Sequence, residues 1–464
     1  MLLLEAGPDL RTNSPELVRD GWHMTREFDW GYASEPDELG AVQKVRRVKL
    51  LGGTSSITRF GVRGSPADYE EWVARGNSGW GFDDLLPYFK RLETDLDFGD
   101  QPWHGDSGPI PIGRYRDIEP MDIHAAGIRG LEAAGFTMVD DHNRPGTVGA
   151  GPMPMSSRDG IRATTLLSYL GTDRTQPNPT IRPDAEVSHV AFDGTRATGI
   201  RLADGTELDA GCVVLCAGTY GSPPILMRSG IGPAEHLRSI GIPVRLNLPG
   251  VGANLADHPA VELDCGYRGP ARAAPLLHTI ATFHSTGVST SAPPDLMFWL
   301  SDPMPQGEPD QFTIGVVLLK PRSTGTVRLR SADPTDAPRI ELPNFKEPSD
   351  LDRLVEGYRR AMEVASSPEI RRLCDGPLPV IGNDGELRRT IRQAAASVPH
   401  VVGTCAMGSS PDAGAVVDAS GRVHGTERLF VVDASIMPTV PSGFTHLPTI
   451  VIAEKLAERV AALL

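Results

Sequence analysis

Long hydrophobic runs and clustered cysteines are both absent from this chain of 464 residues. No run reaches the roughly 18 apolar residues that a membrane-spanning helix needs, so we predict no span. The opening MLLL also lacks the basic residues and longer apolar stretch of a secretory signal. The five cysteines show no metal-ligand spacing, and an odd number excludes a fully paired disulfide framework. We therefore expect reduced, structural thiols, no bound metal and a cytoplasmic location.

Positive charge is also in short supply. Lysine and arginine number 45 against 59 acidic residues, which gives a formal net charge of −14, spread along the chain. This balance argues against nucleic acid or an anionic membrane surface as the main partner. It selects no other partner, and the sequence does not indicate an oligomeric state.

Glycine and proline are plentiful, with 50 and 41 residues, and hydrophobic residues make up 40% of the chain. Apolar, strand-like runs occur along its whole length, so we interpret the glycine and proline as tight turns rather than disorder. The length suffices for two domains, or for one domain with a large second lobe.

The order of the predicted elements indicates an α/β fold. MLLLEAGP predicts a short parallel-type strand, and residues 184–218 predict a meander with DG turns that leads into the strand GCVVLCAG. In that strand, Cys212 and Cys216 should point to one face as small buried residues. SPPILMRSG predicts a helix that opens at its prolines. Residues 260–380 are more antiparallel in pattern, so pieces of a nucleotide-binding-type lobe are interleaved with a second lobe that contains a sheet.

An acid, Glu5, ends the first predicted strand. In a doubly wound sheet, an acid at this place binds the ribose hydroxyls of an adenine dinucleotide, but a strand-end glutamate is more often a solvated loop residue. The glycine-rich turn that should precede such an acid by roughly 20 residues is absent from the chain.

Two further stretches bring backbone amides to places where ligands bind. LGGTSS, residues 51–56, allows close approach of the backbone and supplies hydroxyl donors, or it is simply a tight turn with a helix cap. CAGTYGSPP puts bare amides at the carboxyl end of a buried strand, where open α/β sheets bind ligands.

Two of the twelve histidines follow or precede glycine- and proline-rich turns outside the regular amphipathic helices. His400 lies in VPHVVGTCAMG, and His446 lies two residues before the expected first turn of the last helix, PTIVIAEK. A helix N-terminus there suits an atom that gains negative charge. A single histidine is usually structural, so the pattern alone does not establish a site.

Taken together, these stretches resemble the GMC (glucose–methanol–choline) flavoprotein oxidoreductases. GGTSSITRFGVRGSPADYEEWVARGNSGWGFDDLLPYFKRLE resembles the first signature of that family, and AGTYGSPPILMRSGIGP resembles the second. GVGANLADHP, HVVGTCAMG and VVDASIMPTVPSGFTHLPTIVIAEK follow in the family's order. The resemblance implies a Rossmann-like FAD-binding lobe and an interleaved α+β substrate lobe built on an antiparallel sheet.

The resemblance also implies domain boundaries. The FAD-binding lobe would comprise residues 1–110, with a flavin-lid loop at 50–95, then residues 181–260 and the catalytic segment 396–464. Residues 111–180 would form a lid and part of the substrate lobe, and residues 261–395 the substrate-binding domain.

The roles that the resemblance implies are an active-site base and its partner, His400 and His446, and a set of residues around non-covalent FAD. That cofactor set is Glu5, Gly52, Gly53, Ser55, Thr58, Val187, Ala217, Gly218, Asp433, Ala434 and Thr449. Thr58 replaces the usual asparagine in a segment one residue shorter than the family's. Phe298, Trp299 and Phe312 are candidate cleft residues, although aromatic side chains on such strands are more often core.

The implied reaction is oxidation of an alcohol, with His400 taking the hydroxyl proton while a hydride passes to flavin N5. O2 or another acceptor would then reoxidise the flavin, as in choline dehydrogenase-like members. One alternative is a hydroxynitrile lyase, in which FAD is redox-silent. Another is a non-catalytic chain that does not bind FAD, because the G-x-G-x-x-G fingerprint is absent from the sequence. Met1 stands where the family usually has Val, so we also expect that the sequence begins at a start codon misplaced inside a longer gene.

Overall fold

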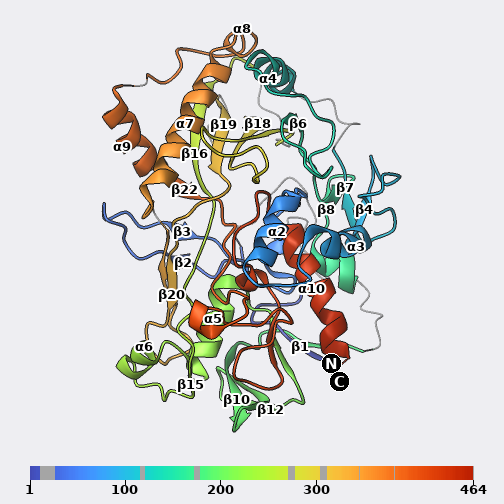
Figure 1. Cartoon of the computed structure of the whole chain (residues 1–464), viewed down its shortest axis with the longest axis vertical. Coiled ribbons are helices and arrows are strands. Elements are labelled where there is room, and N and C mark those ends of the chain that lie inside the picture. The colour runs from blue at the N-terminus through green and yellow to red at the C-terminus, as the bar shows by residue number, and fades with distance from the viewer. Residues whose placement is uncertain are drawn as a thin grey trace.

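The computed structural model describes residues 1–10, 27–114, 121–171, 178–269, 277–303, 311–343, 345–380 and 382–462. The chain forms two lobes (Figure 1). The upper lobe in that view carries an antiparallel sheet and helices α4, α7, α8 and α9. The lower lobe carries the meander β10 to β12 and both termini. We call them the sheet lobe and the nucleotide-binding lobe.

Short parallel strands form the centre of the nucleotide-binding lobe. β1 (Leu2–Leu4) pairs in parallel with β9 (Thr180–Arg182), and β13 (Val213–Leu215) pairs in parallel with β23 (Leu429–Val431). The predicted meander is present as β10 (Val187–Asp193), β11 (Arg196–Leu202) and β12 (Glu207–Asp209), and it leads into β13. The strand predictions for MLLLEAGP and residues 184–218 are therefore confirmed.

Helix α5 (Gly218–Arg228) begins four residues earlier than the prolines of its sequence predict. The prediction placed the start at Ser222, because proline favours a first helical turn. Pro223 instead lies inside the helix and leaves the carbonyl of Thr219 without its usual N–H donor. The hydroxyl of Thr404 donates to that carbonyl at 2.7 Å, so a loop remote in sequence satisfies the group that the proline leaves open.

Three longer helices pack around the same lobe. α2 (Pro66–Ala74) starts with a capping box in which Ser65 and Asp68 each accept from the other's backbone, and α3 (Phe82–Leu92) and α10 (His446–Ala461) pack against each other. Their apolar faces share one buried cluster with β13, β23 and α5. The smaller elements here are η1 (Gly53–Ser56), β4 (Glu93–Asp95), β5 (Ile110–Ile112), β14 (Ile231–Gly232), α6 (Ala234–Ser239), β15 (Leu246–Asn247), η3 (Pro411–Ala413) and η4 (Ala434–Ile436).

The sheet lobe is built on six strands in the order β22-β16-β19-β18-β17-β6. All of the pairings are antiparallel, as predicted for this part of the chain. The strands are β6 (Ala150–Pro152), β16 (Pro259–Gly266), β17 (Thr279–Phe283), β18 (Leu296–Ser301), β19 (Gln311–Leu318) and β22 (Ala396–Ser397). The helices are α4 (Asp122–Ala133), α7 (Pro348–Ala365), α8 (Pro368–Arg371) and α9 (Asp384–Ala394).

The two faces of this sheet have different neighbours, because side chains alternate along each strand. Phe298 and Phe312 are fully buried on the face that packs against α4 and α7, so they are core residues. Trp299 lies on the other face, in a cluster with Phe60 and Phe444 that bridges to the nucleotide-binding lobe. Of the three candidate cleft aromatics, only Trp299 faces that lobe.

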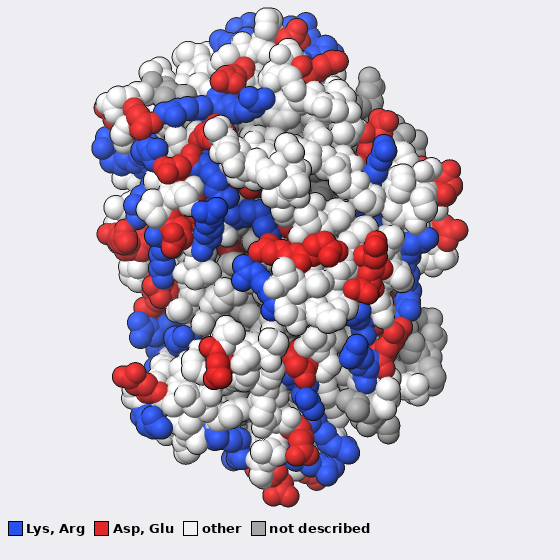
Figure 2. Space-filling view, viewed as in Figure 1, with Lys and Arg blue, Asp and Glu red and all other residues white. Residues whose placement is uncertain are grey.

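The remaining pairs are β2 (Tyr32–Ala33) with β3 (Lys44–Val45), β7 (Ser157–Arg158) with β8 (Ile161–Arg162) and β20 (Thr326–Arg328) with β21 (Arg339–Glu341); η2 (Leu166–Leu170) is a π-helical turn. Among the described residues, no helix has the length and apolar character needed to cross a membrane. Acidic and basic side chains are interspersed over the face shown in Figure 2.

The prediction that Cys212 and Cys216 are both buried is wrong for Cys216 and holds only in part for Cys212. Cys212 is half-buried and Cys216 is exposed, although all five cysteines are free thiols. Cys216 follows the last residue of the short strand β13, where the chain turns into α5, so regular strand alternation no longer governs its burial.

Candidate active site

His400 lies between two other rings at the junction of the lobes. Its Nδ1 is 3.0 Å from Nδ1 of His258, and the two rings meet edge to face with centroids 5.2 Å apart. The ring of Phe444 lies 4.8 Å from His400 on another side. Burial, followed by the charges of His258 and Arg47, lowers the pKa of His400 well below its usual range. The imidazole is therefore neutral near pH 7.

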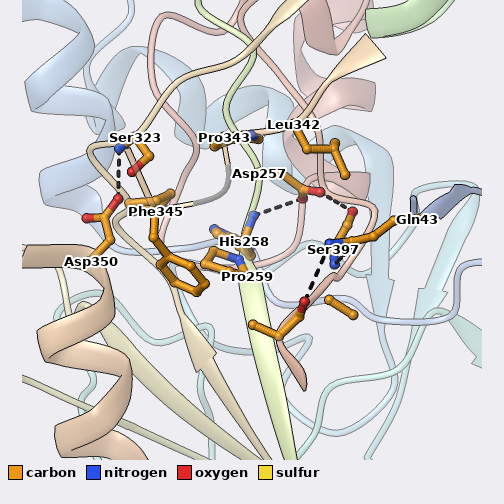
Figure 3. A pocket seen from close by; sticks show the side chains of 13 residues that line it. Gln43, Asp257, His258, Pro259, Ser323, Leu342, Pro343, Phe345, Asp350 and Ser397 are labelled. Carbon is orange, nitrogen blue, oxygen red and sulfur yellow. Dashed lines mark hydrogen bonds between the residues drawn. The ribbon is translucent and has the colours of Figure 1, made fainter. Parts of the chain in front are cut away.

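One carboxylate oxygen fixes the backbone at both histidines. Oδ1 of Asp257 accepts the N–H of His258 and the N–H of His400, each at 2.8 Å. Ser397 donates its hydroxyl to the other oxygen, and Figure 3 shows these side chains around a cavity of about 40 Å³. His258 and Asp257 line this cavity, whereas His400 does not. Burial raises the pKa of Asp257 to about 6, although the hydrogen bond from Ser397 opposes that shift.

His446 is the first residue of α10 and is held in the interior. The helix starts at His446 itself, two residues earlier than predicted, because the N–H of Thr449 donates to the carbonyl of Thr445 at 3.0 Å. Burial and then the charge of Arg162 lower the pKa of His446 to about 4. Its Nε2 is buried and has no hydrogen-bond partner among the described residues. Because Phe444 connects this segment to His400, the predicted histidines lie on neighbouring segments.

The predicted cofactor residues near the N-terminus gather around the end of β1. Oε1 of Glu5 accepts the N–H of Gly7 at 2.8 Å, and burial raises the pKa of Glu5. A Cβ on Gly7 would lie 2.1 Å from the carbonyl oxygen of Lys49, so only glycine lets this turn approach the segment that leads into LGGTSS. The carbonyl of Glu5 accepts from Ala185, two residues before Val187, which is half-buried in β10.

The LGGTSS loop is closed by its own hydroxyls. Ser55 Oγ donates to the carbonyl of Gly52 at 2.6 Å and lies 2.9 Å from Oγ1 of Thr165. The Ser55 hydroxyl therefore stabilises the loop and connects it to Thr165. Gly53 starts the helical turn η1, and the backbone N–H of Thr58 donates to Thr54 just after it. The buried hydroxyl of Ser56 has no partner among the described residues.

The remaining predicted cofactor residues meet at Asp433. Its Oδ2 accepts the N–H of Gly218 at 2.9 Å and the hydroxyl of Ser222 at 2.6 Å, and its Oδ1 accepts the N–H of Ser435 at 2.8 Å. Ala217 precedes α5, and Ala434 starts η4. Asp433 thus joins the ends of β13 and β23, which meet at the carboxyl edge where α/β sheets bind ligands.

Three observations test whether a dinucleotide such as FAD fits these residues. Buried polar atoms without partners remain at Ser56 Oγ and His446 Nε2 in the described part of the chain. Gly218 has a φ of +75° and no heavy atom within 4 Å of where a Cβ would stand. Cys216, directly after β13, is exposed, so the end of this strand is open beside Gly218, and the surrounding protein and Asp433 raise the pKa of the Cys216 thiol to about 12. These residues fit a bound dinucleotide.

Sequence reasoning missed Asp257, His258 and Arg162 as site residues. Asp257 and His258 lie in the motif GVGANLADHP, whose place in the chain gave no sign of a contact with His400, 142 residues later. Arg162 is fully buried, and its Nη1 donates to the carbonyl of Ser56. An acid and a histidine directly before a proline are a weak signal, because such residues are usually structural.

A second buried cluster contains the metal-ligand types Glu93, Asp95 and His104. Arg63 lies 2.9 Å from Glu93, and Arg114 lies 2.8 Å from Asp95, so two guanidinium groups already neutralise the carboxylates. This cluster is a structural ion-pair network.

Comparison with known proteins identifies the family. Models of GMC oxidoreductases match residues 40–260 and 321–453. The chain is 35% identical to 5-(hydroxymethyl)furfural oxidase from Methylovorus sp. (strain MP688), covering 99% of this chain and 93% of the relative. It is 33% identical to oxygen-dependent choline dehydrogenase 1 from Chromohalobacter salexigens, covering 99% and 90%. Pyridoxine 4-oxidase from Mesorbium loti is a structural neighbour with a TM-score of 0.90 and 28% identity, covering 99% and 93% of the two chains.

The chain belongs to the GMC oxidoreductase family. It is an FAD-dependent alcohol oxidoreductase, with a small-molecule substrate and an electron acceptor. The sequence-based predictions of family, Rossmann-like fold, enzyme class and FAD are confirmed. The individual roles of the predicted site residues and the domain boundaries stay predictions.

Proposed function

We propose that His400 is the base that removes the hydroxyl proton of the alcohol. An alcohol gives up a hydride readily only as its hydroxyl proton leaves, so a base is needed within hydrogen-bond reach. His400 supports this role because it is neutral near pH 7 and is held by contacts on two sides. His446 orients the hydroxyl, since its Nε2 has no other partner among the described residues.

The observation that carries the proposal is the ring of His400, held between His258 and Phe444 at the junction of the lobes. Bound FAD supplies the acceptor for the hydride from the alcohol carbon. Glu5, Gly52, Gly53, Ser55, Thr58, Val187, Ala217, Gly218, Asp433, Ala434 and Thr449 would hold FAD without a covalent bond. The carbonyl product leaves His400 with the proton, which must return to solvent before the next turnover.

The surroundings of His400 favour an alcohol whose carbon skeleton is apolar. Phe444 contacts the His400 ring, and Phe60 stacks on Phe444 with ring centroids 4.8 Å apart. Trp299 and Val398 pack into the same cluster. We therefore propose a primary or secondary alcohol of modest polarity, in line with the hydroxymethyl group named for the first relative. 5-(Hydroxymethyl)furfural is the first compound to test, and choline the second.

O2 or another acceptor completes the cycle in this proposal. Production of hydrogen peroxide in air, compared with reduction of an artificial dye, separates the oxidase from the dehydrogenase. A cytoplasmic location also stays a prediction, supported by five free cysteines.

Replacement of the base tests the proposal. In His400→Gln, we expect reduction of the bound flavin by an alcohol under anaerobic conditions to slow by roughly 100-fold or more, the range for loss of a general base. The visible spectrum should still show bound FAD. Unchanged reduction in the variant would refute the role of His400. Absence of bleaching with every alcohol in the native enzyme would instead favour the redox-silent lyase.

A further inference from the structure

His258 is a fully buried histidine that the reaction proposed above does not use. It lies directly before β16, and both of its ring nitrogens have partners. Nδ1 is 3.0 Å from Nδ1 of His400, and Nε2 is 3.1 Å from the carbonyl oxygen of Pro441. We call His258 and His400 the histidine pair.

These two distances determine where the protons of the histidine pair lie. A carbonyl oxygen only accepts, so Nε2 of His258 must carry a proton and donate it to Pro441. A neutral His258 then has a bare Nδ1, which accepts a hydrogen bond. The only proton that can fill the contact between the rings is the one on Nδ1 of His400. His400 is thereby left with a bare Nε2, the nitrogen that a base needs.

His258 remains neutral because of its surroundings. Burial, together with the charge of Lys320, lowers the pKa of His258 to about 3. At neutral pH, the ring therefore cannot become a double donor and turn the contact with His400 into a repulsive one. Lys320 on the His258 side and Arg47 on the His400 side both oppose a positive imidazole. Asp257, whose carboxyl accepts the backbone N–H of both histidines, also titrates beside the pair.

The carbonyl that fixes His258 is itself anchored on both sides. Lys320 Nζ donates to the carbonyl of Val440 at 2.8 Å, and Ser442 donates its N–H and its hydroxyl to Oδ2 of Asp68 at 2.8 and 2.6 Å. Lys320 and Asp68 form an ion pair at 2.9 Å. Pro441, between Val440 and Ser442, therefore has little freedom to move away from His258.

We propose that His258 is a positioning residue that holds His400 in the tautomer with a proton on Nδ1 and a bare Nε2. The chain of contacts runs from Pro441 to His258 to His400. When His400 takes the substrate proton on Nε2, the neutral Nδ1 of His258 accepts from the imidazolium and stabilises it. This inference rests on the proposed role of His400, but it makes a separate statement about where the resting proton lies.

Nitrogen-15 NMR of the FAD-bound enzyme, labelled at histidine, tests the proton positions without turnover. We expect His400 to be protonated at Nδ1 and His258 at Nε2, with His400→Gln and His258→Gln used to assign the signals. Protonation of resting His400 at Nε2 would overturn the inference, whatever the activity of the enzyme. Because it is made on the native enzyme, this measurement tests the proton positions even if a substitution such as His258→Leu prevents folding.

Three substitutions test the consequence for the base. His258→Leu removes the acceptor, so we expect flavin reduction by alcohol to fall at least about tenfold and its pH dependence to change, because His400 is free to exchange tautomers. His258→Gln should restore most of the rate, since its amide can accept from His400 and donate to Pro441. His424→Leu is the control, because His424 also bonds a carbonyl, that of Gly408 at 3.0 Å. It should leave rate and pH profile unchanged.

The outcomes separate this inference from the proposed function. If His258→Leu keeps the native rate and pH profile, or if Leu and Gln lose activity equally in folded protein, the positioning role is wrong while His400 can still be the base. If His400→Gln keeps the native rate, the base assignment is wrong, but NMR still reports the tautomer. FAD content and the thermal midpoint, measured for each variant, exclude loss of cofactor or fold as the cause.

Discussion

At the scale of single residues, the carboxylate of Asp257 holds the backbone of the histidine pair, and its ionisation links that geometry to pH. Burial raises its pKa to about 6, from a reference of 3.8. Between these values the folded state binds more protons than the unfolded state. The contribution of Asp257 to stability is therefore complete below pH 3.8 and is lost as pH rises through 6.

We predict that Asp257→Asn stabilises the protein above pH 6. The shift corresponds to about 3 kcal/mol as an upper value, and the amide oxygen can still accept from His258 and His400. The variant should also lose the fall in unfolding free energy between pH 4 and 6, measured by urea denaturation. Asp209→Asn, at an exposed position in β12, is the control and should change neither quantity. Equal pH dependence in Asp257→Asn and the native protein would contradict the assigned pKa.

The residue scale also marks a limit of sequence analysis. His400 could be proposed from the motif around it, because several long motifs occur in the family's order. Its partner could not, since His258 lies 142 positions away and no local pattern connects the two. The same holds for the unpaired Nε2 of His446, because burial depends on the packed structure.

At the scale of elements, Asp433 follows β23 closely in the chain and makes three hydrogen bonds, two to α5 and one to η4. The N-terminus of α5 has free N–H groups, and Asp433 satisfies the first of them at Gly218. Burial raises the pKa of Asp433, although these hydrogen bonds oppose the shift. The carboxylate of Asp433 therefore satisfies three donors, which are the N–H of Gly218, the hydroxyl of Ser222 and the N–H of Ser435.

We predict that Asp433→Ala lowers the free energy of unfolding by about 3 kcal/mol or more, because buried donors left unpaired cost about 1–3 kcal/mol each. Asp433→Asn should lose less, since its amide oxygen keeps an acceptor in place. Urea denaturation followed by tryptophan fluorescence measures both. A loss in Asp433→Ala no larger than in Asp209→Asn would mean that the three contacts contribute little to the fold.

Elements that depend on neighbouring residues could be predicted, and those that depend on distant ones could not. The meander β10 to β12 follows from alternating apolar residues and DG turns, and the structure contains it as predicted. The start of α5 differs because Asp433, 215 residues away, binds the N–H of Gly218. Thr404 likewise satisfies a carbonyl inside α5 from 185 residues away.

At the scale of the whole molecule, Lys320 connects the two lobes. It lies just after β19 of the sheet lobe, and its Nζ contacts Asp68 at 2.9 Å and Glu71 at 3.0 Å, both in α2. Burial would lower the pKa of Lys320, but the two carboxylates outweigh it and raise that pKa. The cation therefore stays charged in the interior and ties α2 to the loop that carries Pro441.

We predict that Lys320→Met lowers the free energy of unfolding by about 3–5 kcal/mol, because it leaves the buried carboxylate of Asp68 without its cation. Lys346→Met is the matched control, since Lys346 pairs with Glu341 at the same 2.9 Å on the exposed surface and should cost less than about 1 kcal/mol. In the double variant Lys320→Met with Asp68→Asn, part of the lost unfolding free energy should return, because the unpaired charge is gone.

Lys320→Met also removes the donor to the carbonyl of Val440, so Pro441 gains freedom to move. The pH profile of alcohol-dependent flavin reduction should therefore move toward that of His258→Leu. Equal losses in the buried and exposed lysine variants would show that the ion pair does not hold the lobes together.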